Sequence, residues 1–112
     1  MKHDMKLANK PFEDIRDERK VIESRLYDEK RQKIQLGDEI VFSNTDDMTQ
    51  TVKTRVSGLL RYATFKELFT DNNPNLFGGT SSVALLSQIK TFYSDEEEQE
   101  YGVVGIRLQK ID

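Results

Sequence analysis

Residues 51–62 carry the pattern that most restricts the fold, because it is the pattern of a long, half-buried β-strand. Val52, Thr54 and Val56 alternate with charged and polar residues, and successive side chains of a strand point to opposite faces. Gly58 follows this alternation, and a glycine there favours a bulge that helps a sheet to curl. The pattern predicts a sheet with one face on a core and one toward solvent.

The rest of the chain has the pattern of short strands and short helices, with no linker, repeat or low-complexity segment. Thr64 with Glu67 and Ser94 with Glu97 have capping-box spacing, which predicts a helix after each pair. Gly102 is expected to end the second of these helices. Further strands are expected within residues 21–27, 36–42 and 103–108, further helices at residues 11–20 and 82–93, and loops at residues 44–50 and 71–79.

These elements do not alternate as regular strand–helix–strand units, so a doubly wound parallel sheet is not expected. We predict the α+β class: a small mixed, mostly antiparallel β-barrel of about five strands, partly closed, with short helices at its ends. The 112 residues suit one domain, spanning residues 1–112, with a core that needs no disulfides.

Composition excludes several kinds of site. The chain has no cysteine and one histidine, His3, in a polar N-terminal stretch that we expect to be frayed. A histidine-based triad or a zinc site is therefore not expected, and we predict neither a metal nor a cofactor. The net charge of −3, from 17 Lys and Arg against 20 Asp and Glu, argues against a protein that coats nucleic acid through bulk positive charge.

The chain also lacks the pattern of a membrane or secreted protein. No apolar run approaches the roughly 20 residues of a membrane-spanning helix. The first residues contain no apolar stretch of the kind found in secretory signals. The absence of cysteine fits a reducing compartment, so we expect a cytoplasmic protein with no membrane partner.

Lys20, Glu23 and Arg25 place charges in a segment that otherwise has the pattern of a strand. In a strand, Glu23 and Arg25 point to one face and Ile22 and Leu26 to the other, because the side-chain period is two. Opposite charges side by side on a strand either face water or line a polar site. The residues by themselves leave both possibilities open.

Residues 20–25 have the spacing K-x-x-E-x-R, which resembles part of the signature of ASCH domains, a family of the PUA-like superfamily. Glu18 departs from that signature, which usually has glycine two residues before the lysine, and this leaves open the angle at which the chain enters the motif. The resemblance extends over about residues 6 to 108. Three further segments are similar to the family in the same order: residues 36–42, residues 62–68 and residues 93–106.

The resemblance implies a barrel whose cleft is lined by Lys20, Glu23 and Arg25 and which binds RNA or a modified nucleoside. Arg25 would offer its planar guanidinium to a phosphate or to the acceptor edge of a base. Lys20 would contact a phosphate, and Glu23 would accept a hydrogen bond from an exocyclic amine. The alternative is an internal Glu23–Arg25 salt bridge that shapes the mouth of the barrel and binds no ligand.

One branch of the superfamily resembles a small amidohydrolase that removes the acyl group from acetylated cytidine, using a lysine, a threonine three residues later and a distant glutamate. Lys20 matches the lysine, whereas Glu23 occupies the threonine position, and the distant glutamate is not assigned. A variant mechanism would use Lys20 or Glu23 as general base on water and Arg25 to stabilise the oxyanion. Lys20 and Glu23 are thus the catalytic candidates of an alternative function, hydrolysis of an N-acylated cytidine such as N4-acetylcytidine.

An acidic segment at residues 94–101 allows a third function, that of a protein-interaction domain. Its acidic side chains are expected to form the solvated face of a short helix, because runs of like charge usually lie in solvent. They comprise Glu96, Glu97, Glu98 and Glu100.

Overall fold

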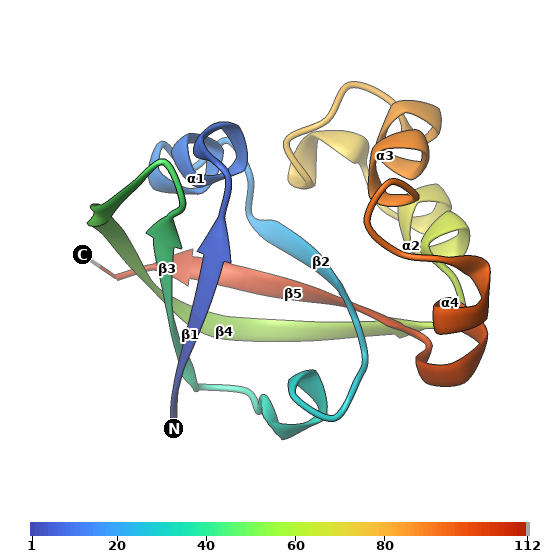
Figure 1. The fold of residues 1–112 in the computed structure, drawn as a ribbon, viewed down its shortest axis with the longest axis horizontal. Helices are drawn as coiled ribbons and strands as arrows, with labels where there is room; N and C mark the ends of the chain where they lie inside the picture. The colour runs from blue at the N-terminus through green and yellow to red at the C-terminus, as the bar shows by residue number, and fades with distance from the viewer. Residues whose placement is uncertain (112) are drawn as a thin grey trace.

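A five-stranded sheet curled into a half-barrel forms the frame of the protein (Figure 1). The computed structural model describes residues 1–111. The strands are β1 (Lys2–Leu7), β2 (Ile22–Leu26), β3 (Glu39–Asn44), β4 (Asp47–Tyr62) and β5 (Val103–Lys110). Their order is β1-β3-β4-β5-β2, with β1 parallel to β3 and every other pair antiparallel. The predicted α+β fold with a mixed, mostly antiparallel sheet is confirmed.

Short helices lie at two ends of this sheet (Figure 1). They are α1 (Asn9–Arg16), α2 (Phe65–Asp71), α3 (Ser82–Ile89) and α4 (Asp95–Tyr101), with single 3₁₀ turns at Arg31–Lys33 and Pro74–Leu76. α1 packs against β1 and β3, whereas α2 packs against α3 and the β4–β5 end of the sheet. No helix among residues 1–111 has the length and apolar character needed to cross a membrane.

The two predicted capping patterns begin α2 and α4. The Thr64 hydroxyl accepts a hydrogen bond from the Glu67 amide at 3.2 Å. Ser94 and Glu97 form a complete capping box, in which each side chain accepts from the other's backbone amide. Gly102 ends α4 with φ +70°, a conformation that glycine adopts without steric cost.

The central strand β4 has the predicted alternation. Val52, Thr54 and Val56 are buried, and the Thr54 hydroxyl is satisfied by donating to the Ile40 carbonyl at 2.9 Å. The pairing of β4 with β5 shifts register between Val56 and Gly58, which confirms the predicted bulge. Such an irregularity bends and twists a strand, and it helps the sheet to curl.

Two apolar clusters lie on either side of β2. The first contains Phe12 and Ile15 of α1, packed onto buried side chains of β1, β3, β4 and β5. In the second, Ile22 and Leu26 of β2 are buried with α2 side chains such as Phe65. Since alternate residues of a strand face opposite ways, Glu23 and Arg25 face the side of the first cluster, whereas Ser24 shares the face of Ile22 and Leu26.

The expectation of a frayed N-terminus is wrong. Residues 2–7 form β1, whose Met5 and Leu7 are buried in the first cluster. His3 is held by Asp38, with 2.8 Å between Nε2 and Oδ2. The sequence obscured this strand because only two of its six residues are strongly apolar, and its partner β3 begins more than thirty residues later.

Several element boundaries also differ from expectation. The first helix is Asn9–Arg16 rather than 11–20, and α3 ends at Ile89 instead of continuing to residue 93. The loop expected at residues 44–50 is a tight connection, because β4 already begins at Asp47. β4 begins early because Asp47 pairs with Asn44 of β3, a pairing that the local sequence does not indicate.

The expectation that Glu98 lies on a solvated helix face is wrong as well. Glu98 is buried, and its carboxylate accepts a hydrogen bond from the Phe65 amide at 2.8 Å and pairs with the Lys90 ammonium. This residue joins α4 to the start of α2 and to the end of α3. Glu96, Glu97 and Glu100 are exposed as expected.

Candidate functional site

Glu23 and Arg25 lie on the same face of β2, as the period of two predicts. Their register partners on β5 are Ile106 and Val104, both members of the first apolar cluster. β2 pairs only with β5 and is therefore an edge strand of the sheet. Glu23 is nevertheless only 4 % exposed, so its charge is buried and needs partners.

Lys20 and Arg25 supply those partners. The Lys20 Nζ lies 2.9 Å from Glu23 Oε1, and the Arg25 Nε and Nη2 lie 2.9 Å and 2.8 Å from Oε2. The Ser24 amide also donates to Oε1, at 3.2 Å. The structure thus joins the three residues predicted from the sequence in one arrangement, which we call the charged trio.

The trio keeps Glu23 ionised. Burial by itself disfavours the charged carboxylate, but the positive charges of Lys20 and Arg25 and their hydrogen bonds outweigh it and lower the pKa of Glu23 to about 2. Burial likewise works against the charged guanidinium of Arg25, whereas Glu23 and the phenol of Tyr93 raise the pKa of Arg25. The trio therefore sets an ionised carboxylate against two basic side chains.

The backbone around Lys20 is tied to two other segments. The Lys20 amide donates to the Asp14 carbonyl of α1 at 3.0 Å, and Lys20 forms an isolated antiparallel bridge with Phe77. Glu18, just upstream, adopts φ +61°, the left-handed conformation that favours glycine. The turn into the motif therefore has a glycine-like backbone although this chain has a glutamate there.

Arg25 also spans the gap between the two edge strands. Its Nη2 donates to the Lys6 carbonyl of β1 at 3.2 Å, although β1 and β2 lie at opposite edges of the sheet. The half-barrel is therefore joined at this seam by a side chain and not by a backbone ladder.

A cleft of about 490 Å³ opens at the seam, between β1 and α1 on one side and the α2–α3 region on the other. Its charged lining comprises four cations and two carboxylates, a net charge of +2, whereas the whole chain carries −3. The cations are Lys6, Lys10, Lys20 and Arg25, the carboxylates are Asp14 and Glu23, and the aromatic lining comprises Phe69, Phe77, Phe92 and Tyr93.

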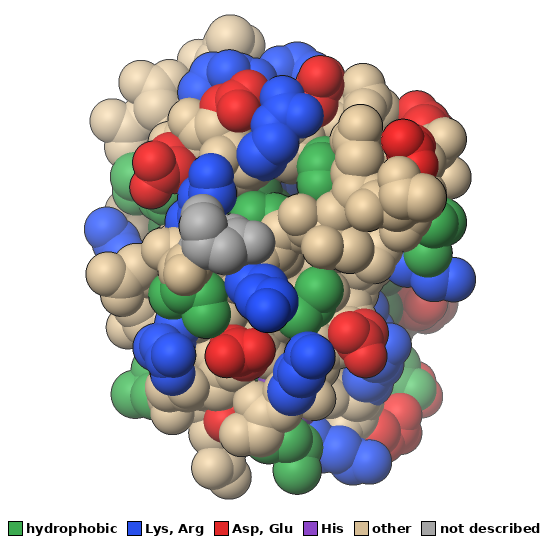
Figure 2. Space-filling model, turned by 90° about the vertical axis from the view of Figure 1, so that its left-hand side faces the viewer, with side chains coloured by type: hydrophobic (Ala, Val, Ile, Leu, Met, Phe, Trp, Pro, Cys, Tyr) green, Lys and Arg blue, Asp and Glu red, His purple; other side chains and the backbone are tan. Residues whose placement is uncertain are grey.

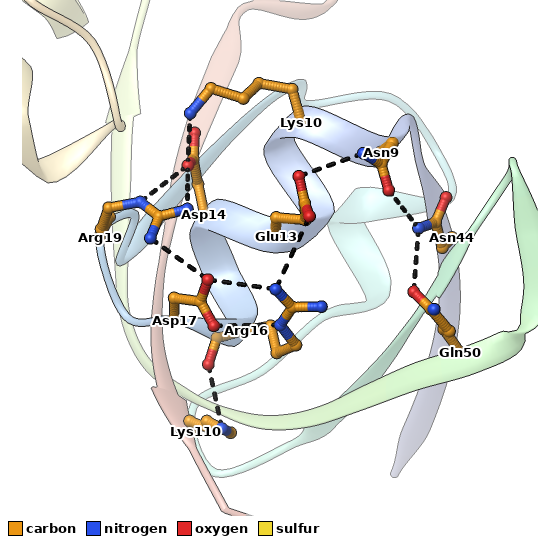
Figure 3. Close-up of polar contacts among 10 residues, drawn as sticks. All are labelled: Asn9, Lys10, Glu13, Asp14, Arg16, Asp17, Arg19, Asn44, Gln50 and Lys110. Carbon is orange, nitrogen blue, oxygen red and sulfur yellow. Dashed lines mark hydrogen bonds and ion pairs between the residues drawn. The ribbon is translucent and has the colours of Figure 1, made fainter.

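Asp14 is a cleft residue that the sequence analysis did not identify. Its side chain is 7 % exposed, and Oδ1 accepts from Lys10 Nζ at 2.8 Å and from Arg19 Nε at 3.1 Å (Figure 3). Burial disfavours its ionised form, but the hydrogen bonds from Lys10 and Arg19 outweigh this and lower the pKa of Asp14. The i, i+4 spacing of Lys10 and Asp14 was the available signal.

On one face of the molecule, positive and negative side chains are interspersed (Figure 2). Figure 2 shows the face on the left of Figure 1, where lysines and arginines are interspersed with acidic side chains and uncharged surface. A ligand drawn by charge would find no uninterrupted basic area on this face. The described residues 1–111 also hold no cluster of three or more His, Asp or Glu side chains arranged to bind a metal ion.

Comparisons with known proteins agree with this fold. The family model of the ASCH domain matches residues 5–112. The crystal structure of hypothetical protein PH0355 is 35 % identical, with a TM-score of 0.87, covering 99 % of this chain and 100 % of that one. The solution NMR structure of protein PF0455 from Pyrococcus furiosus is 34 % identical, with a TM-score of 0.77, covering 100 % of this chain and 99 % of that one. A search of curated proteins found no match. The chain belongs to the ASCH domain family.

Proposed function

We propose that the cleft binds single-stranded RNA or a modified nucleoside, with one base entering beside the charged trio. ASCH domains are often RNA-binding, which gives the class of ligand. The observation that carries the proposal for this chain is the positively charged, aromatic-lined cleft in an otherwise acidic protein. Its volume of about 490 Å³ lies within the usual range of ligand pockets.

The charges of the cleft favour an anionic ligand. Lys20 uses its ammonium on one carboxylate oxygen, and an ammonium has three donors, so it retains capacity for a phosphate. Arg25 uses Nε and Nη2 on Glu23 and Lys6, and Nη1 has no bond to either of these acceptors. In this arrangement Glu23 positions both cations, and the cations contact the ligand.

The aromatic lining suits a base. Phe92 is 70 % exposed although it lines the cleft, so its ring offers an uncovered face near the opening. Single-stranded nucleic acids stack their bases on such rings, at about 1–3 kcal/mol per base. Tyr93 lies deeper, stacked on Phe65 at 5.6 Å between ring centroids, and its phenol is near Arg25. The lining therefore combines stacking surfaces with cations.

The same geometry argues against Glu23 as the general base of the amidohydrolase alternative. A general base works best when its pKa is near the working pH, and the Glu23 pKa of about 2 makes this carboxylate a weak base. Both of its oxygens already accept hydrogen bonds from protein donors. Incubation with N4-acetylcytidine followed by chromatography tests this, and we expect the substrate peak to remain unchanged.

The test of the binding proposal is a titration of the protein with short fluorescent single-stranded RNAs, followed by anisotropy at several salt concentrations. We expect affinity that falls with added salt, since phosphate contacts release counterions. Arg25→Ala should weaken binding about tenfold or more. Arg107→Ala is the matched control, because Arg107 is an exposed strand arginine that does not line the cleft.

The two variants lose the same charge, so a general electrostatic effect would weaken both equally. Circular dichroism and thermal unfolding establish that each variant is folded before its binding is compared. The proposal fails if neither RNA nor a panel of nucleosides and nucleotides binds the folded wild-type protein. It also fails if Arg107→Ala weakens binding as much as Arg25→Ala.

A further inference from the structure

We infer that Asp14 reads the base in this cleft, and that the cleft selects nucleotides whose base carries an exocyclic amino group. This inference rests on the proposed function and names the ligand class of the same site. It assigns the recognition of the base to a residue outside the K-x-x-E-x-R motif. The two carboxylates in the cleft, Asp14 and Glu23, differ in their free hydrogen-bonding capacity.

Glu23 has little capacity left for a ligand. Its Oε1 accepts from Lys20 and from the Ser24 amide, and its Oε2 accepts twice from the Arg25 guanidinium. A base amine that reached Glu23 would have to displace one of these charge-assisted bonds, which are among the stronger hydrogen bonds in proteins. Glu23 is thus committed to holding the two cations in place.

Asp14 is bonded on one side only. Lys10 and Arg19 both donate to Oδ1, and Figure 3 shows the two cationic side chains converging on this carboxylate. Within residues 1–111 no donor is bonded to the second oxygen, Oδ2. The side chain is 93 % buried and lines the cleft, so Oδ2 is an acceptor held in place by its neighbours with its lone pairs unused.

Gly78 keeps the space beside this oxygen open. A Cβ atom added at Gly78 would lie 3.3 Å from Asp14 Oδ2 and 3.2 Å from the Cβ of Lys20. Gly78 has φ +77° and also lines the cleft. The backbone therefore passes close to Asp14 and Lys20 without a side chain that would cover the free oxygen.

An ionised carboxylate oxygen can only accept hydrogen bonds. A ligand atom placed against Oδ2 must therefore be a donor, and a carbonyl oxygen in the same place would be repelled and left without a partner. Among the bases, cytosine and adenine carry an amine where uracil and hypoxanthine carry a carbonyl. One well-placed base contact discriminates by about 1–3 kcal/mol, so we expect about tenfold preference for the amino base.

The experiment measures the affinity of the wild-type protein for two pairs of 5′-monophosphates by isothermal titration: cytidine against uridine, and adenosine against inosine. Within each pair a carbonyl replaces the exocyclic amine, and the adjacent ring nitrogen changes from an acceptor to an N–H donor. We expect cytidine and adenosine monophosphates to bind about tenfold more tightly than their counterparts. Equal affinity within both pairs, or tighter binding of uridine and inosine, overturns the inference whether or not any variant folds.

Asp14→Asn then tests the residue. Lys10 and Arg19 donate to one side of residue 14, so they orient the amide oxygen toward themselves and its NH₂ group into the cleft. A donor thus replaces an acceptor, and the preference should fall to one or reverse. Asp17→Asn is the control, because Asp17 also pairs with Arg19 but does not line the cleft; its preference should equal that of the wild type.

Ribose 5-phosphate, which has no base, separates base recognition from phosphate binding. Asp14→Asn should change the affinity for ribose 5-phosphate only slightly. It should change the ratio of the cytidine monophosphate affinity to the uridine monophosphate affinity much more. A variant that loses affinity for every ligand equally, with the ratio unchanged, shows that Asp14 only supports the fold and overturns the inference. If the wild-type protein binds no nucleotide at all, the proposed function itself has failed.

Discussion

The charged trio gives a stability prediction that can be worked from the structure. Glu23→Gln resembles the protonated form of Glu23, because it keeps the shape of the side chain and removes its charge. A lowering of the Glu23 pKa from 4.5 to about 2 corresponds to about 3 kcal/mol of folding stability. We therefore expect Glu23→Gln to lower the free energy of unfolding at pH 7 by about 3 kcal/mol.

The pH dependence has a definite sign. A carboxyl whose pKa is lower in the folded protein stabilises the fold above its unfolded pKa, and this contribution is lost as the pH falls toward the folded value. The difference between the wild type and Glu23→Gln should thus be full at pH 7 and less than about half of that at pH 3. Near pH 1, below both pKa values, it should vanish.

Urea unfolding monitored by circular dichroism at pH 7, 5, 4 and 3 measures this difference directly. Glu29→Gln, at an exposed residue that follows β2, is the control and should change stability by less than about 0.5 kcal/mol. The reasoning is refuted if Glu23→Gln lies within about 1 kcal/mol of the wild type at pH 7. It is equally refuted if the difference does not shrink between pH 7 and pH 3.

Four further predictions concern single residues. Phe92→Ala should weaken RNA binding about tenfold in the anisotropy titration while thermal unfolding stays unchanged, because the ring is 70 % exposed. Glu18→Gly should raise the free energy of unfolding by about 1 kcal/mol in urea, because residue 18 has φ +61°. Gly102→Ala should lower the free energy of unfolding by about 1–3 kcal/mol, since φ +70° with ψ −173° is a conformation that L-residues rarely adopt. Asp38 accepts from His3 and its pKa is lowered to about 2. In thermal unfolding, the wild type should lose stability between pH 4 and pH 2 as Asp38 becomes protonated. Asp38→Asn should lack this contribution at pH 4 and should therefore lose less stability over the same range.

Features that depend on local geometry could be predicted from the sequence. Glu23 and Arg25 share a face because the strand period is two, whatever the strand packs against. The capping box of Ser94 and Glu97 closes over four consecutive residues. The bulge at Gly58 belongs to the same class, since a single residue type marks it. In the first two cases the controlling contacts lie within a few positions in the chain, whereas the Gly58 bulge is marked locally but forms in the pairing with β5.

Features that depend on distant partners could not be predicted in this way. Glu98 follows the pattern of an exposed acidic helix, and its burial depends on the Phe65 amide 33 residues earlier. Asp14 has its cation partners nearby, but its place in a cleft depends on segments that reach it from β2 and from the Gly78 turn. A sequence pattern identifies such a residue as polar without indicating what surrounds it.

The position of the cleft follows from the incomplete closure of the sheet. β1 and β2 are the two edge strands, and each leaves one side of its backbone without a strand partner. Had these strands paired directly, a backbone ladder would have closed the wall and excluded buried charges from it. Instead the Arg25 guanidinium reaches the Lys6 carbonyl across the seam.

An arginine can make that contact in a partly buried place only if its charge is balanced, and Glu23 provides the balance two residues away on the same face. A salt bridge that only filled the seam would need one cation. The second cation, Lys20, also lines the cleft and gives the trio a net positive charge, although the whole chain has a net charge of −3. The charges therefore hold the seam together and leave a net positive charge beside the cleft, which is the charge that the proposed binding of an anionic ligand requires.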